Sequence, residues 1–208
     1  MLCGSFMESS DRKLNLQDVD GSAFGTASDL CCGKTQCLEM ELDEMRALAS
    51  VADRLQMTAV VSALDETVMR HLEMSVCGEV LSWSGELGLR QLEEATRKLA
   101  TDRFEELAKT EGFMRMGEKA LGRLLDDDNL AARNEEAVWE AVAGWMRNGA
   151  VQGHGVVGKV RFPLMGDKYL VSLVVGMVGE EDRFHHKEWI EGAVAEALRA
   201  RAALREGS

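Results

Sequence analysis

The chain has 208 residues, 46% of them apolar, and its 36 Asp and Glu against 24 Lys and Arg give a formal net charge of −12. Binding to phosphate backbones or to anionic membrane surfaces needs clustered Lys and Arg, so we expect neither nucleic-acid nor membrane partners. One proline against 20 glycines, and 5% aromatic residues, favour a folded protein made mainly of helices.

No apolar run reaches the roughly 18 residues of a transmembrane helix. The segment 1–8 lacks the basic and apolar regions of a secretory signal. We therefore expect a cytoplasmic protein, with the nucleus as the alternative location. The five cysteines are expected to be free thiols that pack as small buried apolar groups.

In chain order, residues 13–16 alternate like one short strand around Leu14, and residues 18–21 form the turn that ends it. Apolar residues then recur every three or four positions, which predicts a succession of short helices. Their predicted ranges are about 43–55, 58–72, 75–83, 89–107, 110–125, 134–146, 167–174 and 188–205. Their expected N-terminal caps are Thr58, Ser75, Thr110, Asn134 and Asp167. Residues 126–129 should break a helix, and residues 179–186 form a candidate linker.

Two glycine-rich segments resemble nucleotide-binding motifs. Residues 153–158, Gly-His-Gly-Val-Val-Gly, fit the dinucleotide fingerprint, but that motif must follow a buried strand and here a helix precedes it. We interpret this segment as a flexible turn between helices. Residues 33–35, Gly-Lys-Thr, end like a P-loop, yet Ser28 stands where the motif requires glycine. A nucleotide-dependent enzyme is retained only as a third alternative.

The remaining polar clusters favour structural roles. Cys31, Cys32 and Cys37 lie near one another and His71 could join them, but paired zinc-ligand spacing is missing. The acidic segment 126–128 lacks the ligand spacing of a calcium loop. We therefore expect no enzymatic activity, no catalytic residues, no cofactor and no metal site.

Several stretches together carry a family resemblance. They are residues 4–10, 14–24 and 48–57, and then 104–107, 121–125, 134–142 with Trp145, and 160–164 with Tyr169 and Leu170. In order and spacing, residues 2–72 resemble the second half of a BTB domain. Residues 75–178 resemble the BACK domain that follows it in kelch-like proteins.

The resemblance implies a mainly α fold in three parts. Residues 1–73 would be a partial BTB domain, α with a short strand, and residues 74–180 an all-α BACK domain. Residues 181–208 would be a linker and a C-terminal helix. The first half of the BTB fold has no counterpart before Met1, and no kelch propeller follows Ser208. We therefore expect either a fragment or shortened gene product, or a BTB remnant that folds only marginally.

The resemblance also implies a function. Kelch-like proteins are typically adaptors of cullin-RING ubiquitin ligases, and their BTB domain grips the cullin with a hydrophobic-x-Glu motif that residues 6–8, Phe-Met-Glu, match. The first BACK helices are similar to the segment that extends this contact. The partner-binding residues we expect are Phe6, Glu8, Val76, Val80 and Trp83.

Two alternatives stay open. Phe6 could simply pack within a terminal segment, and the protein could be a scaffold or oligomerisation module with no ligase connection. Homodimerisation is also expected, weakened by the missing half of the BTB domain.

Overall fold

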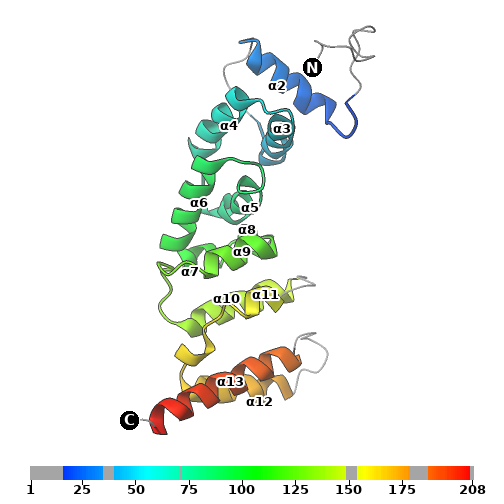
Figure 1. Cartoon of the computed structure of the whole chain (residues 1–208). Helices are drawn as coiled ribbons and strands as arrows, with labels where there is room; N and C mark the ends of the chain where they lie inside the picture. Colours follow the sequence, from blue (N-terminus) through cyan, green and yellow to red (C-terminus); the bar gives the residue numbers. More distant parts are fainter. Residues whose placement is uncertain (1–15, 35–39, 71, 149–153, 179–186, 207–208) are drawn as a thin grey trace. The chain divides into compact units, whose positions relative to one another are not determined.

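The computed structural model describes residues 16–34, 40–70, 72–148, 154–178 and 187–206 (Figure 1). These residues form twelve α-helices and one 3₁₀ helix, and they contain no strand. The prediction of a mainly α fold is therefore confirmed. The short strand predicted around Leu14 lies outside the described residues. No helix among the described residues is both long and apolar enough to cross a bilayer.

The chain divides into two compact units, residues 1–67 and 68–208. The first unit contains α2 (Gly21–Cys31), α3 (Leu42–Arg54) and most of α4 (Thr58–Arg70). Helix α2 packs against α3. Helix α2 was not predicted from the sequence. Its start is fixed by Asp20, which was assigned to a turn and whose carboxylate instead accepts a hydrogen bond from the Ala23 backbone N–H at 2.8 Å.

Helix α3 follows the predicted stripe. Met45, Leu48 and Ala52 are buried, at 6%, 0% and 0% exposure. A reciprocal capping box between Glu41 and Glu44 fixes its first turn, because each side chain accepts from the other residue's backbone N–H.

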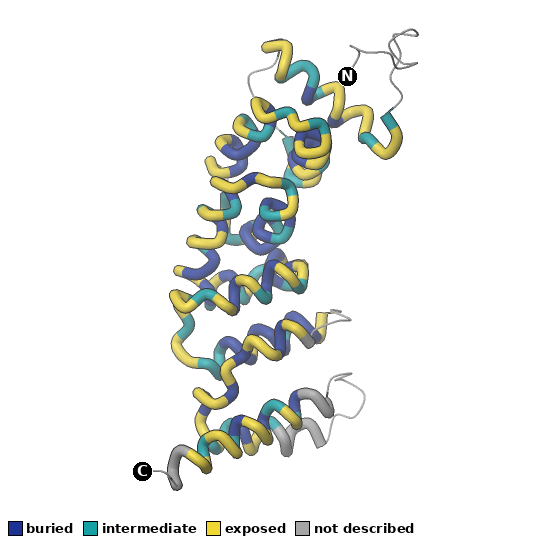
Figure 2. The backbone as a smooth tube through the Cα atoms, viewed as in Figure 1, coloured by how far each residue is buried: buried dark blue, intermediate teal, exposed yellow. Residues whose placement is uncertain are grey.

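The second unit holds the remaining helices. They are α5 (Met74–Ser84), α6 (Arg90–Asp102), α7 (Phe104–Leu107), α8 (Glu111–Met114), α9 (Glu118–Leu125), α10 (Glu135–Arg147), α11 (His154–Val157), η1 (Phe162–Leu164), α12 (Asp167–Val178) and α13 (Lys187–Glu206). One hydrophobic core runs through them, from Cys77 on α5 to Ala197 on α13. Figure 2 shows this core as a series of buried helix faces.

The single helix predicted over 89–107 is interrupted. Arg103 leaves the helical conformation, with φ −129° and ψ 40°, and divides the segment into α6 and α7. The change in direction aims Phe104 and Leu107 at the core, where both are fully buried. Phe104 meets Phe113 edge to face, with ring centroids 6.0 Å apart. Burial of these two side chains outweighs continuation of the helix.

Helix α5 lies against α8 through two glycines. A Cβ atom on Gly112 would be 2.3 Å from the carbonyl oxygen of Ser75, and one on Gly78 would be 2.6 Å from the carbonyl oxygen of Gly112. Both distances are well below van der Waals contact. The two backbones can therefore approach this closely only because neither residue has a side chain.

The C-terminal part of the unit is closed by α13. Ile190, Val194 and Ala197 are buried in the common core. Arg201 on the same helix donates to the carbonyl oxygen of Met165 and forms an ion pair of 3.0 Å with Asp167. The predicted helix 188–205 is thus confirmed.

The glycine-rich segment 153–158 differs from its interpretation as a flexible turn. It forms the short helix α11, in which Val156 and Val157 are fully buried. A helix, α10, precedes it, not the strand that a dinucleotide fingerprint requires.

Candidate protein-interaction site

The helical hairpin of α5 and α6 carries the predicted partner-binding residues that the structure describes. Helix α5 begins after Glu73, two residues before the predicted cap Ser75. The two helices pack along their length, and the Cys77 thiol lies 3.6 Å from the backbone carbonyl of Thr96. Burial raises the pKa of the Cys77 thiol to about 12, so this group stays protonated near neutral pH.

The predicted residues occupy different depths in this hairpin. Val76 is half-buried on α5, whereas Val80 and Trp83 are only 0% and 2% exposed. Phe6 and Glu8 lie outside the described residues. Of the three that can be placed, Val76 is therefore the one whose side chain reaches the surface, and Val80 and Trp83 contribute to the interior behind it.

The same hairpin holds buried polar atoms without hydrogen-bond partners. Among the described residues these are the indole N–H of Trp83 and the hydroxyls of Ser84 and Thr96. Each such group costs about 1–3 kcal/mol of desolvation. The contact between α5 and α6 therefore contains buried polar groups without hydrogen bonds, whereas the side chains around Phe104 are apolar.

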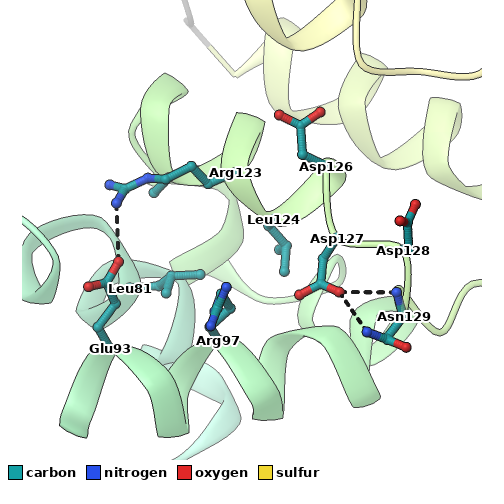
Figure 3. A pocket seen from close by; sticks show the side chains of 10 residues that line it. Leu81, Glu93, Arg97, Arg123, Leu124, Asp126, Asp127, Asp128 and Asn129 are labelled. Carbon is teal, nitrogen blue, oxygen red and sulfur yellow. Dashed lines mark hydrogen bonds and ion pairs between the residues drawn. The ribbon is translucent and has the colours of Figure 1, made fainter. Parts of the chain in front are cut away.

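A second feature is a hollow between α6 and α9, with a volume of about 570 Å³ (Figure 3). Its floor is apolar and consists of Leu81, Ala120 and Leu124, all at most 5% exposed. Polar side chains stand around this floor. They are Glu93 and Arg97 from α6, Arg123 from α9, and Asp126, Asp127, Asp128 and Asn129 from the turn that follows α9.

The end of α9 fixes the position of the acidic residues beside the hollow. Helix α9 stops at Leu125, as predicted from the acidic segment. Asp127 then accepts hydrogen bonds from the backbone and side-chain nitrogens of Asn129, at 3.0 and 3.2 Å. The backbone hydrogen bond is the main reason that the pKa of Asp127 lies below its ordinary value. Asp127 is therefore ionised and held at the edge of the hollow.

This hollow was not predicted from the sequence, in which residues 126–129 were expected only to break a helix. No local signal could have found it, because the wall residues on α6 and those on and after α9 are at least 23 residues apart in the sequence and meet only when α6 packs on α9.

The cysteines are only in part as expected. Cys77 is buried, but Cys31 and Cys32 are free and exposed at the end of α2. The expectation of burial was wrong for these two, because α2 buries only Ala23 and Ala27. Cys3, Cys37 and His71 lie outside the described residues. Within the described part of the chain, no three His, Cys, Asp or Glu residues are grouped to hold a metal ion.

The helices of the second unit match a known protein family. Comparison with protein-family models matches residues 77–175 to BACK, described as BTB And C-terminal Kelch. The match runs from α5 into α12. The chain therefore contains a BACK domain, as its resemblance to this family predicted. BACK domains are typical of BTB-kelch-type proteins, which are typically adaptors, and the family is generally non-catalytic.

Proposed function

We infer that this protein is a non-catalytic adaptor of the kelch-like type, which binds the cullin scaffold of a ubiquitin ligase. The observation that carries this proposal is the BACK domain at residues 77–175, because that domain is typical of adaptors. The partner is another polypeptide, and the contacts are made by side chains on the surface.

In this proposal Phe6, Glu8 and the surface edge of α5 form the cullin contact. A large apolar side chain such as Phe6 would fill a pocket on the partner, and Glu8 would fix the orientation. Val76, which is half-buried on α5, would extend the contact. Val80 and Trp83 would act indirectly, because their burial holds α5 in position.

The test is capture of a purified cullin N-terminal domain by the full chain. Wild type should bind, and the double variant Phe6→Ala with Glu8→Ala should not. Met7→Ala is the matched control, because it changes the residue between the two proposed anchors. Val76→Glu should weaken capture while its circular dichroism melting curve stays that of wild type. Equal capture by wild type and the double variant, or no capture by either, would refute the proposal.

The second candidate is a scaffold or oligomerisation module without a ligase connection. It is favoured if the chain self-associates in analytical ultracentrifugation and never captures a cullin. The same two measurements on one preparation therefore separate the two functions.

A further inference from the structure

The carboxylates around the hollow between α6 and α9 already have partners. Glu93 pairs with Arg123 at 3.1 Å. Asp126 pairs with Lys159 at 2.7 Å, and Asp128 with Arg161 at 3.0 Å. Asp127 accepts two hydrogen bonds from Asn129, as described above. The acidic turn is therefore largely neutralised, although the chain as a whole is strongly acidic.

Arg97 differs from these groups. Within the described residues its guanidinium makes no hydrogen bond and no ion pair, and its positive charge acts on Asp127 only at longer range. Figure 3 shows Arg97 rising from α6 into the hollow, with Leu81 on one side and Asp127 on the other. A guanidinium presents a rigid fork of N–H donors that matches the two oxygens of a carboxylate. Arg97 thus offers an anion site directly above an apolar floor.

We propose that this hollow is a second protein-binding site, in which Arg97 receives an acidic side chain of a partner while a neighbouring apolar side chain covers the small exposed surface of Leu81 and Ala120. Val76, Val80 and Trp83 are not among the residues that line this hollow, and the proposal does not depend on the cullin contact proposed above. The volume of about 570 Å³ lies within the ordinary range for ligand sites.

The chemistry of the walls favours a peptide over other anions. A polyphosphate would need several free cations that converge on it, and Arg97 is the single wall cation in the described structure without a direct partner. An apolar floor beside one cation instead matches an apolar residue next to Asp or Glu.

Asp127 gives the site an internal competitor. Because this carboxylate is ionised and lies near Arg97, it attracts the same guanidinium that a partner would use. Asp127→Asn keeps an oxygen that can accept from Asn129 but removes the charge. That variant should therefore bind an acidic peptide more tightly than wild type does.

The experiment titrates the full, isotopically labelled chain with two peptides and follows NMR shifts. The probe is acetyl-Gly-Leu-Glu-Gly-amide, and the matched peptide has Gln in place of Glu. We expect shifts at the Arg97 side chain and at Leu124 with the first peptide and much smaller shifts with the second. Arg97→Gln should weaken binding by at least about tenfold, which is the effect of losing a charged bidentate contact. Arg90→Gln, at the start of α6 and outside the hollow, should leave binding unchanged.

Three outcomes would overturn the proposal: no shifts at about 10 mM peptide, equal binding of the two peptides, or no effect of Arg97→Gln. A peptide concentration of about 10 mM would detect even weak fragment binding. Tighter binding of a peptide with Arg in place of Glu would overturn it in favour of an acidic site. Arg97→Lys, which keeps the charge without the fork, should show intermediate affinity and a wild-type melting curve. Capture of the cullin should be the same for Arg97→Gln and wild type, so the two proposals can fail separately.

Discussion

The contact between α5 and α8 makes a quantitative prediction at Gly112. An added Cβ would lie 2.3 Å from the Ser75 carbonyl oxygen, so the two helices would have to separate by more than 1 Å to restore van der Waals contact. The atom that must move belongs to the backbone and cannot rotate away. Overpacking of this kind costs about 1–3 kcal/mol. We expect Gly112→Ala to lower the free energy of unfolding by about 2 kcal/mol or more, even after the small entropic gain from replacing glycine.

Gly122 in α9 is the matched control. An added Cβ there meets no atom within 4 Å. Gly122→Ala should therefore raise the stability by up to about 1 kcal/mol, the difference in helix propensity between the two residues. The same substitution is thus expected to have opposite signs at two glycines of one unit.

Urea unfolding followed by tryptophan fluorescence measures both effects. All four tryptophans lie in the second unit, so the signal reports on the part of the chain that contains both glycines. A shift of the midpoint with an unchanged slope identifies a change in stability. If Gly112→Ala were as stable as wild type, or if the two variants shifted in the same direction by similar amounts, close packing of the two backbones would not be what requires glycine at this position.

Three further predictions follow from single groups. Asn134 caps α10 by accepting from the Ala137 N–H at 3.0 Å, so Asn134→Ala should cost about 1 kcal/mol in the same urea assay, and Asn134→Asp should not. A hydrogen bond from the Gly166 N–H lowers the pKa of Glu136 below its ordinary value of 4.5. The ionised Glu136 carboxylate therefore stabilises the fold above pH 4.5, and this stabilisation is lost as the pH falls further. Glu136→Gln should flatten the fall in stability below pH 4.5, and an unchanged acid transition would contradict this. Cys31 is exposed, whereas Cys77 is buried and its pKa is raised to about 12. Iodoacetamide at about pH 8, near the pKa of an ordinary thiol, should therefore label Cys31 in the folded protein and Cys77 only after unfolding. Peptide mass spectrometry measures the labelling of each cysteine.

The caps and apolar stripes were predictable because their signals are local. Thr110 and Asn134 were recognised as caps, and each accepts from the backbone N–H three residues later. The stripe of α3 was recognised because its period of three to four residues is a property of the sequence itself. These features therefore need no knowledge of the tertiary contacts.

Other features depend on contacts that the local sequence does not contain. Helix α2 begins with Gly-Ser-Ala-Phe-Gly, a poor helix-forming sequence that is stabilised by the Asp20 cap and by packing on α3. Nothing near Arg103 is a helix breaker, and the break follows from the burial of Phe104. Trp83 illustrates a further limit, because an interior position and a partner-facing position both favour a large apolar side chain.

The limits of the family match are not the physical limits of the folded unit. The match ends at residue 175, within α12. The core continues, because Ile190 and Val194 on α13 are fully buried in the same cluster as Phe162 and Leu170. Burying two aliphatic side chains of this size contributes about 3–6 kcal/mol by area, comparable to much of the stability of a small domain. The BACK domain of this chain is therefore a structure that α13 completes, and any interaction surface assigned to it must be described with that helix in place.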